Sequence, residues 1–190
     1  FVSQTRDFVL PATACILQKK LGLNKNILAY DIPLGCSGFV YGLYTAFLMS
    51  KNMKSKGLLL LGDMSSKFID FKDKKMFGLF GDAGTAVAIN YKKKLENFSC
   101  FSFGTDGGGY KDLIYNSTGI NDCKNKKFVE MNGAKIFEFA LNEVPLQVKK
   151  LLVKSKNTIN SIDYFVFHQA NKFLIKTLMK KLKIPNKKII

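Results

Sequence analysis

Four consecutive leucines occupy residues 58–61, and a glycine stands at each end of the run. A short, uninterrupted apolar run of this kind is typical of a strand that is covered on both faces. Upstream, apolar residues recur at helical spacing over residues 39–48, and residues 27–32 are strand-like. The sequence therefore predicts a strand, a helix and a strand in succession, a βαβ unit. Because the helix is apolar around much of its circumference, we expect it to be buried.

The same alternation continues along the chain and favours an α/β fold with layered sheets. A Gly-rich turn at 77–84 leads into a strand, and Pro145 is expected to kink or restart a long helix. The further expected elements are helices at 10–21, 133–155 and 171–183 and strands at 85–89, 98–103 and 164–168.

A lysine triplet at 92–94 marks a boundary between two halves, residues 1–93 and 94–190. The chain ends on Ile189 and Ile190, which resemble the start of a strand. We therefore expect these 190 residues to be part of a longer protein.

Composition indicates a globular protein, with 47% hydrophobic and 23% charged residues. No apolar stretch approaches the roughly 20 residues that span a bilayer. The first residues lack the order of a basic and then an apolar region that marks a signal peptide. We therefore expect a cytoplasmic protein without disulfides.

The formal net charge is +16, which raises the question of a nucleic-acid partner. Of the 30 basic residues all but Arg6 are lysines, whereas base and phosphate recognition favour the planar arginine side chain. A general bias of composition toward lysine is one explanation of the charge. The other is a surface that attracts an acidic protein or a phosphorylated small molecule.

Cys36 lies between glycines, after a predicted strand and turn and before a predicted helix. A helix N-terminus there would stabilise a thiolate and offer N–H groups to an oxyanion. The alternative is a small buried hydrophobic residue, which we expect for Cys15. The four cysteines are widely spaced and only one histidine accompanies them, so no metal site is expected.

That histidine, His168, stands at the carboxyl end of a predicted strand, where α/β proteins gather their active sites. A hydrogen-bonded structural histidine is the alternative. The helix that follows carries Lys172, Lys176 and Lys180 on one side, either a solvated face or a docking surface. The glycines of 78–84 precede a strand, which favours close backbone packing over phosphate binding.

Four motifs occur in a fixed order: Gly35-Cys36-Ser37-Gly38-Phe39, Phe80-Gly81-Asp82-Ala83-Gly84, Met131-Asn132-Gly133 with Phe137, and His168-Gln169-Ala170-Asn171. Together they resemble the β-ketoacyl-[acyl-carrier-protein] synthase III family, condensing enzymes of the thiolase superfamily. The resemblance implies a duplicated thiolase fold, layered α-β-α-β-α, in a homodimer. Residues 1–93 would be the later part of the N-terminal half, and 94–190 the first part of the C-terminal half.

The resemblance also implies a reaction that starts fatty-acid chains without a metal or a cofactor other than the coenzyme A thioester substrate. Cys36 would accept an acyl group, such as acetyl, from coenzyme A. His168 and an asparagine would hydrogen-bond the thioester carbonyl of malonyl-acyl carrier protein as carbon dioxide leaves. Leu10 would reach the partner subunit's pocket, and Lys172, Lys176 and Lys180 would dock the carrier protein. The implied tunnel residues are Leu79, Phe80, Gly133, Phe137, Ala170, Asn171 and Leu174.

The sequence departs from the family pattern at three places. The Gly-Asn motif that supplies the catalytic asparagine has no match after Asn171, the N-terminal segment of family members has no match within these residues, and a basic docking position is Phe173 here. We therefore expect the 190 residues alone to be inactive in the condensation of acetyl-CoA with malonyl-acyl carrier protein. Alternatives are a related acyltransferase of sugar, polyketide or signal-molecule synthesis, which would share the same motifs, and a non-catalytic partner subunit.

Overall fold

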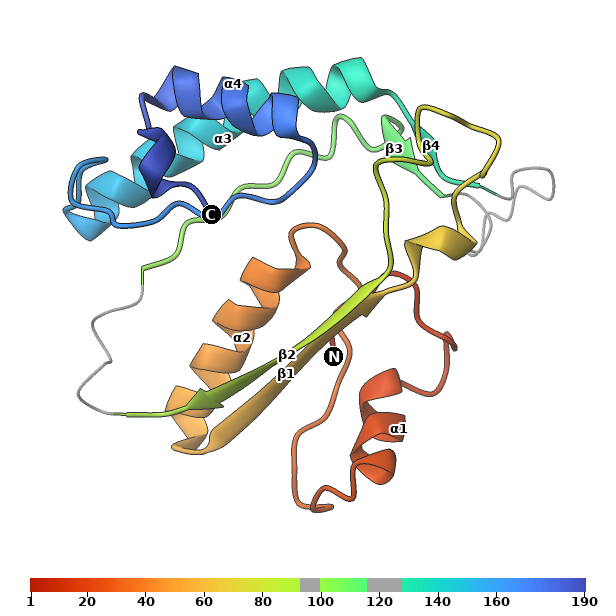
Figure 1. The fold of residues 1–190 in the computed structure, drawn as a ribbon. Helices are drawn as coiled ribbons and strands as arrows, with labels where there is room; N and C mark the ends of the chain where they lie inside the picture. Colours follow the sequence, from red (N-terminus) through yellow and green to blue (C-terminus); the bar gives the residue numbers. More distant parts are fainter. Residues whose placement is uncertain (93–99, 116–127) are drawn as a thin grey trace. The chain divides into compact units, whose positions relative to one another are not determined.

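The computed structural model describes residues 1–92, 100–115 and 128–190. The chain forms two compact units (Figure 1). The first comprises residues 1–67 and 80–99, and the second comprises residues 68–79 and 100–190.

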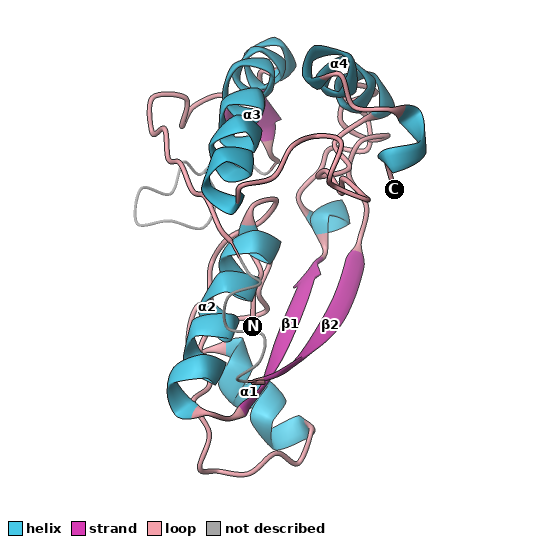
Figure 2. Ribbon diagram, turned by 90° about the vertical axis from the view of Figure 1, so that its left-hand side faces the viewer, coloured by secondary structure: helices cyan, strands magenta, loops and turns pink. Residues whose placement is uncertain are grey.

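The first unit is built on an antiparallel pair of strands. In this pair Lys56 lies opposite Asn90 and Asp63 lies opposite Ala83. Helix α2 packs along both strands (Figures 1 and 2). The elements are α1 (Thr13–Lys20), α2 (Gly38–Met53), β1 (Lys56–Asp63), the 3₁₀ turn η1 (Ser65–Lys67) and β2 (Ala83–Asn90).

The strand expected at 27–32 is reduced to a single bridge at Ile32. Val2 forms parallel bridges both to Ile32 and to Leu61 of β1. The chain thus runs from Ile32 through α2 to β1 as a parallel crossover, as the βαβ prediction requires. A strand needs a hydrogen-bonded neighbour along its length, and here the neighbour is only the short segment around Val2.

Burial within the first unit is less complete than the sequence suggests. Leu59 is 4% exposed but Leu58 is 48% exposed, so the leucine run is covered on one face and not on both. In α2, Phe39 and Val40 are exposed, whereas Gly38 and Gly42 are buried. The helix therefore buries a narrow face of small residues, and the expectation that this helix is buried is wrong for the described structure.

The second unit is built on two helices that pack against each other, α3 (Gly133–Ser155) and α4 (Lys172–Leu182) (Figure 1). Both match their predicted positions. α3 continues through Pro145, which is buried, so the proline does not end the helix. The smaller elements are β3 (Leu113–Ile114), β4 (Glu130–Met131) and the 3₁₀ turn η3 (Asn186–Lys188).

The strand expected at 164–168 is also wrong as a full strand, because only Phe165 pairs, in a parallel bridge to Ile189. Of the strand expected at 98–103, residues 98 and 99 lie outside the described residues, and residues 100–103 are not in a strand. None of the helices in the described segments is both long enough and apolar enough to cross a membrane.

Candidate functional site

Cys36 lies in the turn that leads into α2. The turn is closed by a 2.7 Å hydrogen bond from the Gly38 N–H to the Gly35 carbonyl, and Ser37 is the N-cap residue. The cysteine is exposed at the surface of the first unit. The sequence prediction of a cysteine between a turn and a helix is correct.

Three glycines let the start of α2 approach the first residues of the chain. A Cβ atom on Gly35 would lie 2.1 Å from Gln4 Oε1, and one on Gly38 would lie 2.5 Å from Val2 Cγ1. A Cβ on Gly42 would lie 2.8 Å from Val2 Cγ2. Gly38 and Gly42 thus let the start of α2 pack closely against the Val2 side chain, whereas the contact at Gly35 is with the movable end of the Gln4 side chain.

The electrostatic surroundings of Cys36 favour the neutral thiol. Although Cys36 as a whole is exposed, the surrounding protein partly removes its thiol from solvent, and this desolvation raises the pKa of Cys36. The negative charge of Asp63 acts in the same direction. The backbone N–H of Cys36 opposes this shift but is outweighed. The expected stabilisation of a thiolate by the helix N-terminus therefore does not set the pKa of this thiol.

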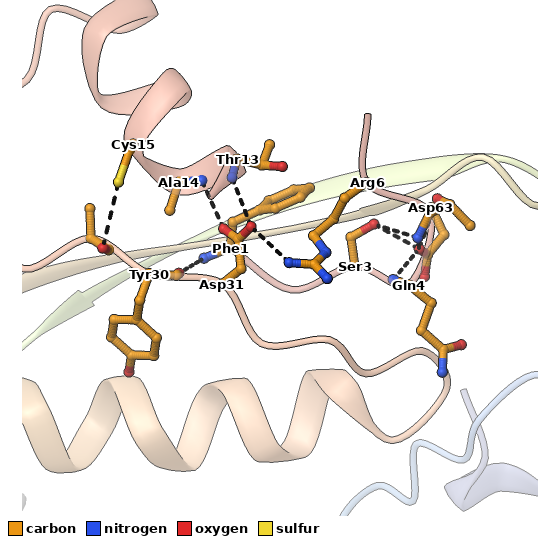
Figure 3. Close-up of polar contacts among 12 residues, drawn as sticks. Phe1, Ser3, Gln4, Arg6, Thr13, Ala14, Cys15, Tyr30, Asp31 and Asp63 are labelled. Atoms are coloured by element: carbon orange, nitrogen blue, oxygen red, sulfur yellow. Dashed lines mark hydrogen bonds and ion pairs between the residues drawn. The ribbon is translucent and has the colours of Figure 1, made fainter. Parts of the chain in front are cut away.

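Asp63, at the end of β1, ties the first residues of the chain to the sheet (Figure 3). Its Oδ1 accepts hydrogen bonds from Ser3 Oγ at 2.9 Å and from the Gln4 N–H at 2.8 Å. The N–H and hydroxyl of Thr5 donate to the same oxygen at 3.1 and 3.0 Å. Asp63 was not predicted from the sequence. Its only signal is an acidic residue directly after the leucine run and Gly62.

Asp31, which is distant from helix α1 in the sequence, caps the N-terminus of that helix (Figure 3). The N-cap residue of α1, Ala12, has no capping side chain, and Asp31 accepts from the N–H groups of Thr13 and Ala14 at 2.7 and 2.8 Å. Arg6 pairs with Asp31 at 3.4 Å. Burial alone would raise the pKa of Asp31, but these three donors lower it.

Arg6 and Asp63 also line an open cavity of about 430 Å³ within the first unit, together with Ser3, Thr5 and Asp82. Asp82 belongs to the Phe80–Gly84 motif. It accepts hydrogen bonds from the Ser66 N–H at 2.8 Å and the Ser66 hydroxyl at 2.5 Å, which lower its pKa. The motif thereby anchors η1 to the start of β2.

His168 lies in the second unit, in the irregular segment before α4. Its carbonyl accepts a 2.9 Å hydrogen bond from the Ala170 N–H. The His168 residue as a whole is exposed, but partial burial of its ring lowers the pKa of His168 and so favours the neutral imidazole. A neutral imidazole has one N–H donor to offer to an oxygen.

Four of the predicted tunnel residues lie around the packing of α3 and α4. Asn171 is the N-cap of α4 and accepts from the Leu174 N–H at 2.8 Å. Leu174 is 7% exposed, in a core cluster to which Phe137 and Ala170 contribute. A fifth residue, Gly133, is the first residue of α3.

The other predicted residues lie on exposed segments. Leu79 is exposed, Phe80 is half-buried, and Leu10 is 85% exposed. The lysines predicted to dock a carrier protein, Lys172, Lys176 and Lys180, are exposed on α4, whose other side is buried.

The remaining cysteines differ from expectation at one position. Cys15 is exposed, and the buried residue of α1 is its neighbour Ala14. The expectation that Cys15 is buried is therefore wrong. Cys123 lies outside the described residues. No group of three or more potential metal-ligating side chains occurs among residues 1–92, 100–115 and 128–190.

The sequence matches two family models. Residues 30–107 match "3-Oxoacyl-[acyl-carrier-protein (ACP)] synthase III", and residues 152–190 match its C-terminal model. Cys36 lies in the first match and His168 in the second.

Curated relatives carry the same family name. The chain is 35% identical to the β-ketoacyl-[acyl-carrier-protein] synthase III of Prochlorococcus marinus (strain MIT 9312), over 92% of this chain and 55% of the relative. It is 36% identical to that of Clostridium botulinum (strain Hall), over 94% of this chain and 56% of the relative. The chain thus spans about half the length of the relatives it matches.

Solved structures confirm the predicted thiolase-like fold. A 3-oxoacyl-(acyl-carrier-protein) synthase III that is 37% identical superposes with a TM-score of 0.94, over 100% of this chain and 61% of the other. A 3-oxoacyl-(acyl-carrier protein) synthase from Burkholderia xenovorans LB400 is 36% identical, with a TM-score of 0.89, over 100% of this chain and 57% of the other. The chain belongs to the 3-oxoacyl-[acyl-carrier-protein] synthase III family.

Proposed function

We propose that the protein is a condensing enzyme that starts fatty-acid chains. It would join the acyl group of an acyl-CoA, such as acetyl-CoA, to malonyl-acyl carrier protein. The observation that carries this proposal is the position of Cys36 and His168. Cys36 stands two residues before the start of α2 and His168 four residues before the start of α4, one in each of the two matched family segments.

In the first half-reaction Cys36 Sγ attacks the carbonyl carbon of the acyl-CoA thioester. The new carbon–sulfur bond replaces the bond to coenzyme A, which leaves as a thiol carrying the proton from Cys36. Because burial and Asp63 raise the pKa of Cys36, this proton must be lost as the attack proceeds. The Cys36 N–H would stabilise the oxyanion.

In the second half-reaction malonyl-acyl carrier protein loses carbon dioxide, and the electron pair of the broken bond forms an enolate. His168 would donate a hydrogen bond to the enolate oxygen, which a neutral imidazole can do. The carbanion then attacks the carbonyl carbon of the acyl-cysteine, and the carbon–sulfur bond to Cys36 breaks with its electron pair on the sulfur. The sulfur takes up a proton from water to restore the thiol, and a β-ketoacyl carrier-protein thioester is released.

We assign the remaining residues as follows. The tunnel would be bordered by side chains and backbone at Leu79, Phe80, Gly133, Phe137, Ala170, Asn171 and Leu174. Leu10 would enter the pocket of a partner subunit in a homodimer, in line with its 85% exposure. Lys172, Lys176 and Lys180 would dock the carrier protein, and the protein would act in the cytoplasm. Residues 1–93 and 94–190 would be parts of the two thiolase-like halves.

The first half-reaction can be tested by mass spectrometry of the protein after incubation with acetyl-CoA. We expect one acetyl group, located on the peptide that contains Cys36. Cys36→Ala should abolish the adduct, whereas Cys15→Ala, which removes another exposed cysteine, should leave it unchanged. An acetyl group that persists in Cys36→Ala would refute the assignment.

A further inference from the structure

The side chain of Lys188, which lies outside the four sequence motifs, makes three hydrogen bonds to one backbone turn. Its Nζ lies 2.7 Å from the Asn160 carbonyl oxygen and 2.6 Å from that of Ile162. A third contact, to the Ile159 carbonyl oxygen, is 3.3 Å long. An ammonium group has three N–H donors, so these carbonyls satisfy all of them. Bonds from a charged donor are stronger than those between neutral groups.

The backbone of Lys188 and its neighbours holds the segment that leads to His168. The Phe165 N–H donates to the Lys188 carbonyl at 2.7 Å, and the Ile190 N–H donates to the Phe165 carbonyl at 3.4 Å. Beyond the histidine, the Gln169 side-chain amide donates to the Ile190 carbonyl at 3.4 Å. The segment around His168 is therefore fixed on both sides by residues 188–190.

Apolar packing supports the same arrangement. Phe165 and Phe167 stack with ring centroids 6.4 Å apart. Both pack against the buried cluster that includes Ile184, as do Ile159 and Ile189. Lys188 thus links the turn at 159–162 to the backbone that pairs with Phe165. Residues from both sides of this link pack against the same buried cluster.

We propose that Lys188 is a positioning residue for His168, because its ammonium fixes the turn at 159–162 against the backbone that pairs with Phe165. This inference rests on the proposed function for the catalytic role of His168. The claim that Lys188 fixes the position of His168 does not depend on that function. Lys188 itself touches no reacting atom in this proposal.

The test uses the imidazole NMR signal of His168, which is unambiguous because the chain has one histidine. Lys188→Gln replaces the charged ammonium and its three N–H donors by a shorter, neutral amide with two N–H donors. We expect it to shift the His168 ring resonances and to raise the imidazole pKa toward its ordinary value as the ring becomes more hydrated. Lys187→Gln, the same change at the exposed neighbouring residue, should leave both unchanged.

Rescue separates positioning from a general loss of stability. Lys188→Arg keeps the charge, but a flat guanidinium cannot direct its donors as a tetrahedral ammonium does. Its shift should have the same direction and a smaller size. If Lys188→Gln does not fold, the His168 resonances of Lys188→Arg alone test the proposal. Unmoved His168 resonances in a folded variant of either kind would overturn the proposal.

The outcome for Lys188 is independent of the outcome for the proposed function. The NMR experiment needs no substrate, whereas acetylation of Cys36 tests the function without involving His168. A shifted His168 signal in a protein that is not acetylated would keep the positioning role and refute the condensing enzyme.

Discussion

Asp31 and Asp63 each place one carboxylate where several donors converge. Asp31 accepts from Thr13, Ala14 and Arg6, and its side chain is 4% exposed. The first N–H groups of a helix have no partner within the helix, so a carboxylate at that position satisfies them and interacts favourably with the helix dipole. Asp31 thus supplies the cap that Ala12 cannot.

Removing this carboxylate should destabilise the first unit. For Asp31→Ala we expect the free energy of unfolding to fall by about 1–3 kcal/mol, because two backbone donors and Arg6 lose a charged acceptor. Chemical denaturation measures the change. Asp7→Ala, at an exposed aspartate, is the control and should change stability by less than about 0.5 kcal/mol. Equal losses in both variants would contradict the capping role.

The contribution of Asp31 should also depend on pH. Because the pKa of Asp31 is lower in the folded protein, the unfolded chain binds the proton more tightly. The stabilisation is therefore complete above the ordinary aspartate pKa of about 3.9 and is lost as pH falls through the folded value. The stability difference between the protein and Asp31→Asn should shrink over that range. A difference that stays constant down to the acid transition would exclude this linkage.

Asp63 affects the chemistry of Cys36 directly. Its negative charge raises the pKa of the thiol, so Asp63→Asn should lower that pKa while keeping an oxygen that accepts from residues 3–5. We expect the alkylation of Cys36 by iodoacetamide, followed by peptide mass spectrometry, to shift to lower pH. Asp7→Asn serves as the matched control. If the midpoint for Cys36 stays where it was, the charge of Asp63 does not act on the thiol.

At the scale of elements, the glycines of α2 decide how closely the helix approaches the segment around Val2. Gly42→Ala should therefore destabilise the unit by about 1–3 kcal/mol through overpacking, since the new Cβ would lie 2.8 Å from Val2 Cγ2 and 3.0 Å from Leu59 Cδ1. This cost exceeds the gain of about 1 kcal/mol in helix propensity. Thermal unfolding measures the change.

Gly133→Ala is the control for this substitution because Gly133 begins helix α3, where a Cβ would meet only Met131 Cε at 3.9 Å. That contact has ordinary length, so stability should be unchanged or slightly higher. Should Gly42→Ala prove as stable as Gly133→Ala, the close approach of α2 would not depend on the missing side chain.

The helices could be predicted from the sequence because their hydrogen bonds are local and their buried faces recur every 3.6 residues. In α4 the buried side chains include Leu174, Ile175 and Leu178, at the expected spacing. The strands at 27–32 and 164–168 could not, because a strand depends on a partner distant in sequence. Ile32 and Phe165 find such partners only in Val2 and Ile189.

The residues of the candidate site likewise fall into those that the sequence predicts and those that it does not. Cys36 and His168 stand in short motifs that local context makes recognisable. Asp63 and Lys188 act through bonds to residues about 58–60 and 26–29 positions away, and nothing beside them in the sequence predicts those partners. The turn that carries the thiol was therefore predictable. Asp63, which acts on the pKa of that thiol, and Lys188, which holds the segment before His168, were not.

At the scale of the whole molecule, the net charge of +16 should attract any acidic partner, and specific docking must be separated from this general effect. On α4 the lysines Lys172, Lys176 and Lys180 are exposed at a spacing of four residues, which places them on one side of the helix. We predict that changing all three to Glu weakens the binding of an acidic acyl carrier protein by at least about tenfold, or about 1.4 kcal/mol. Fluorescence anisotropy with a labelled carrier protein measures the affinity.

The control changes the net charge by the same amount elsewhere, with Glu at the exposed residues Lys19, Lys20 and Lys25. It should reduce affinity much less, because charges outside a contact act through a field that 0.15 M salt screens over about 8 Å. The difference between the two variants should therefore persist at 0.15 M salt, where long-range attraction is weak. Equal weakening by both triple variants would mean that the carrier protein responds to overall charge and that α4 is not its docking surface.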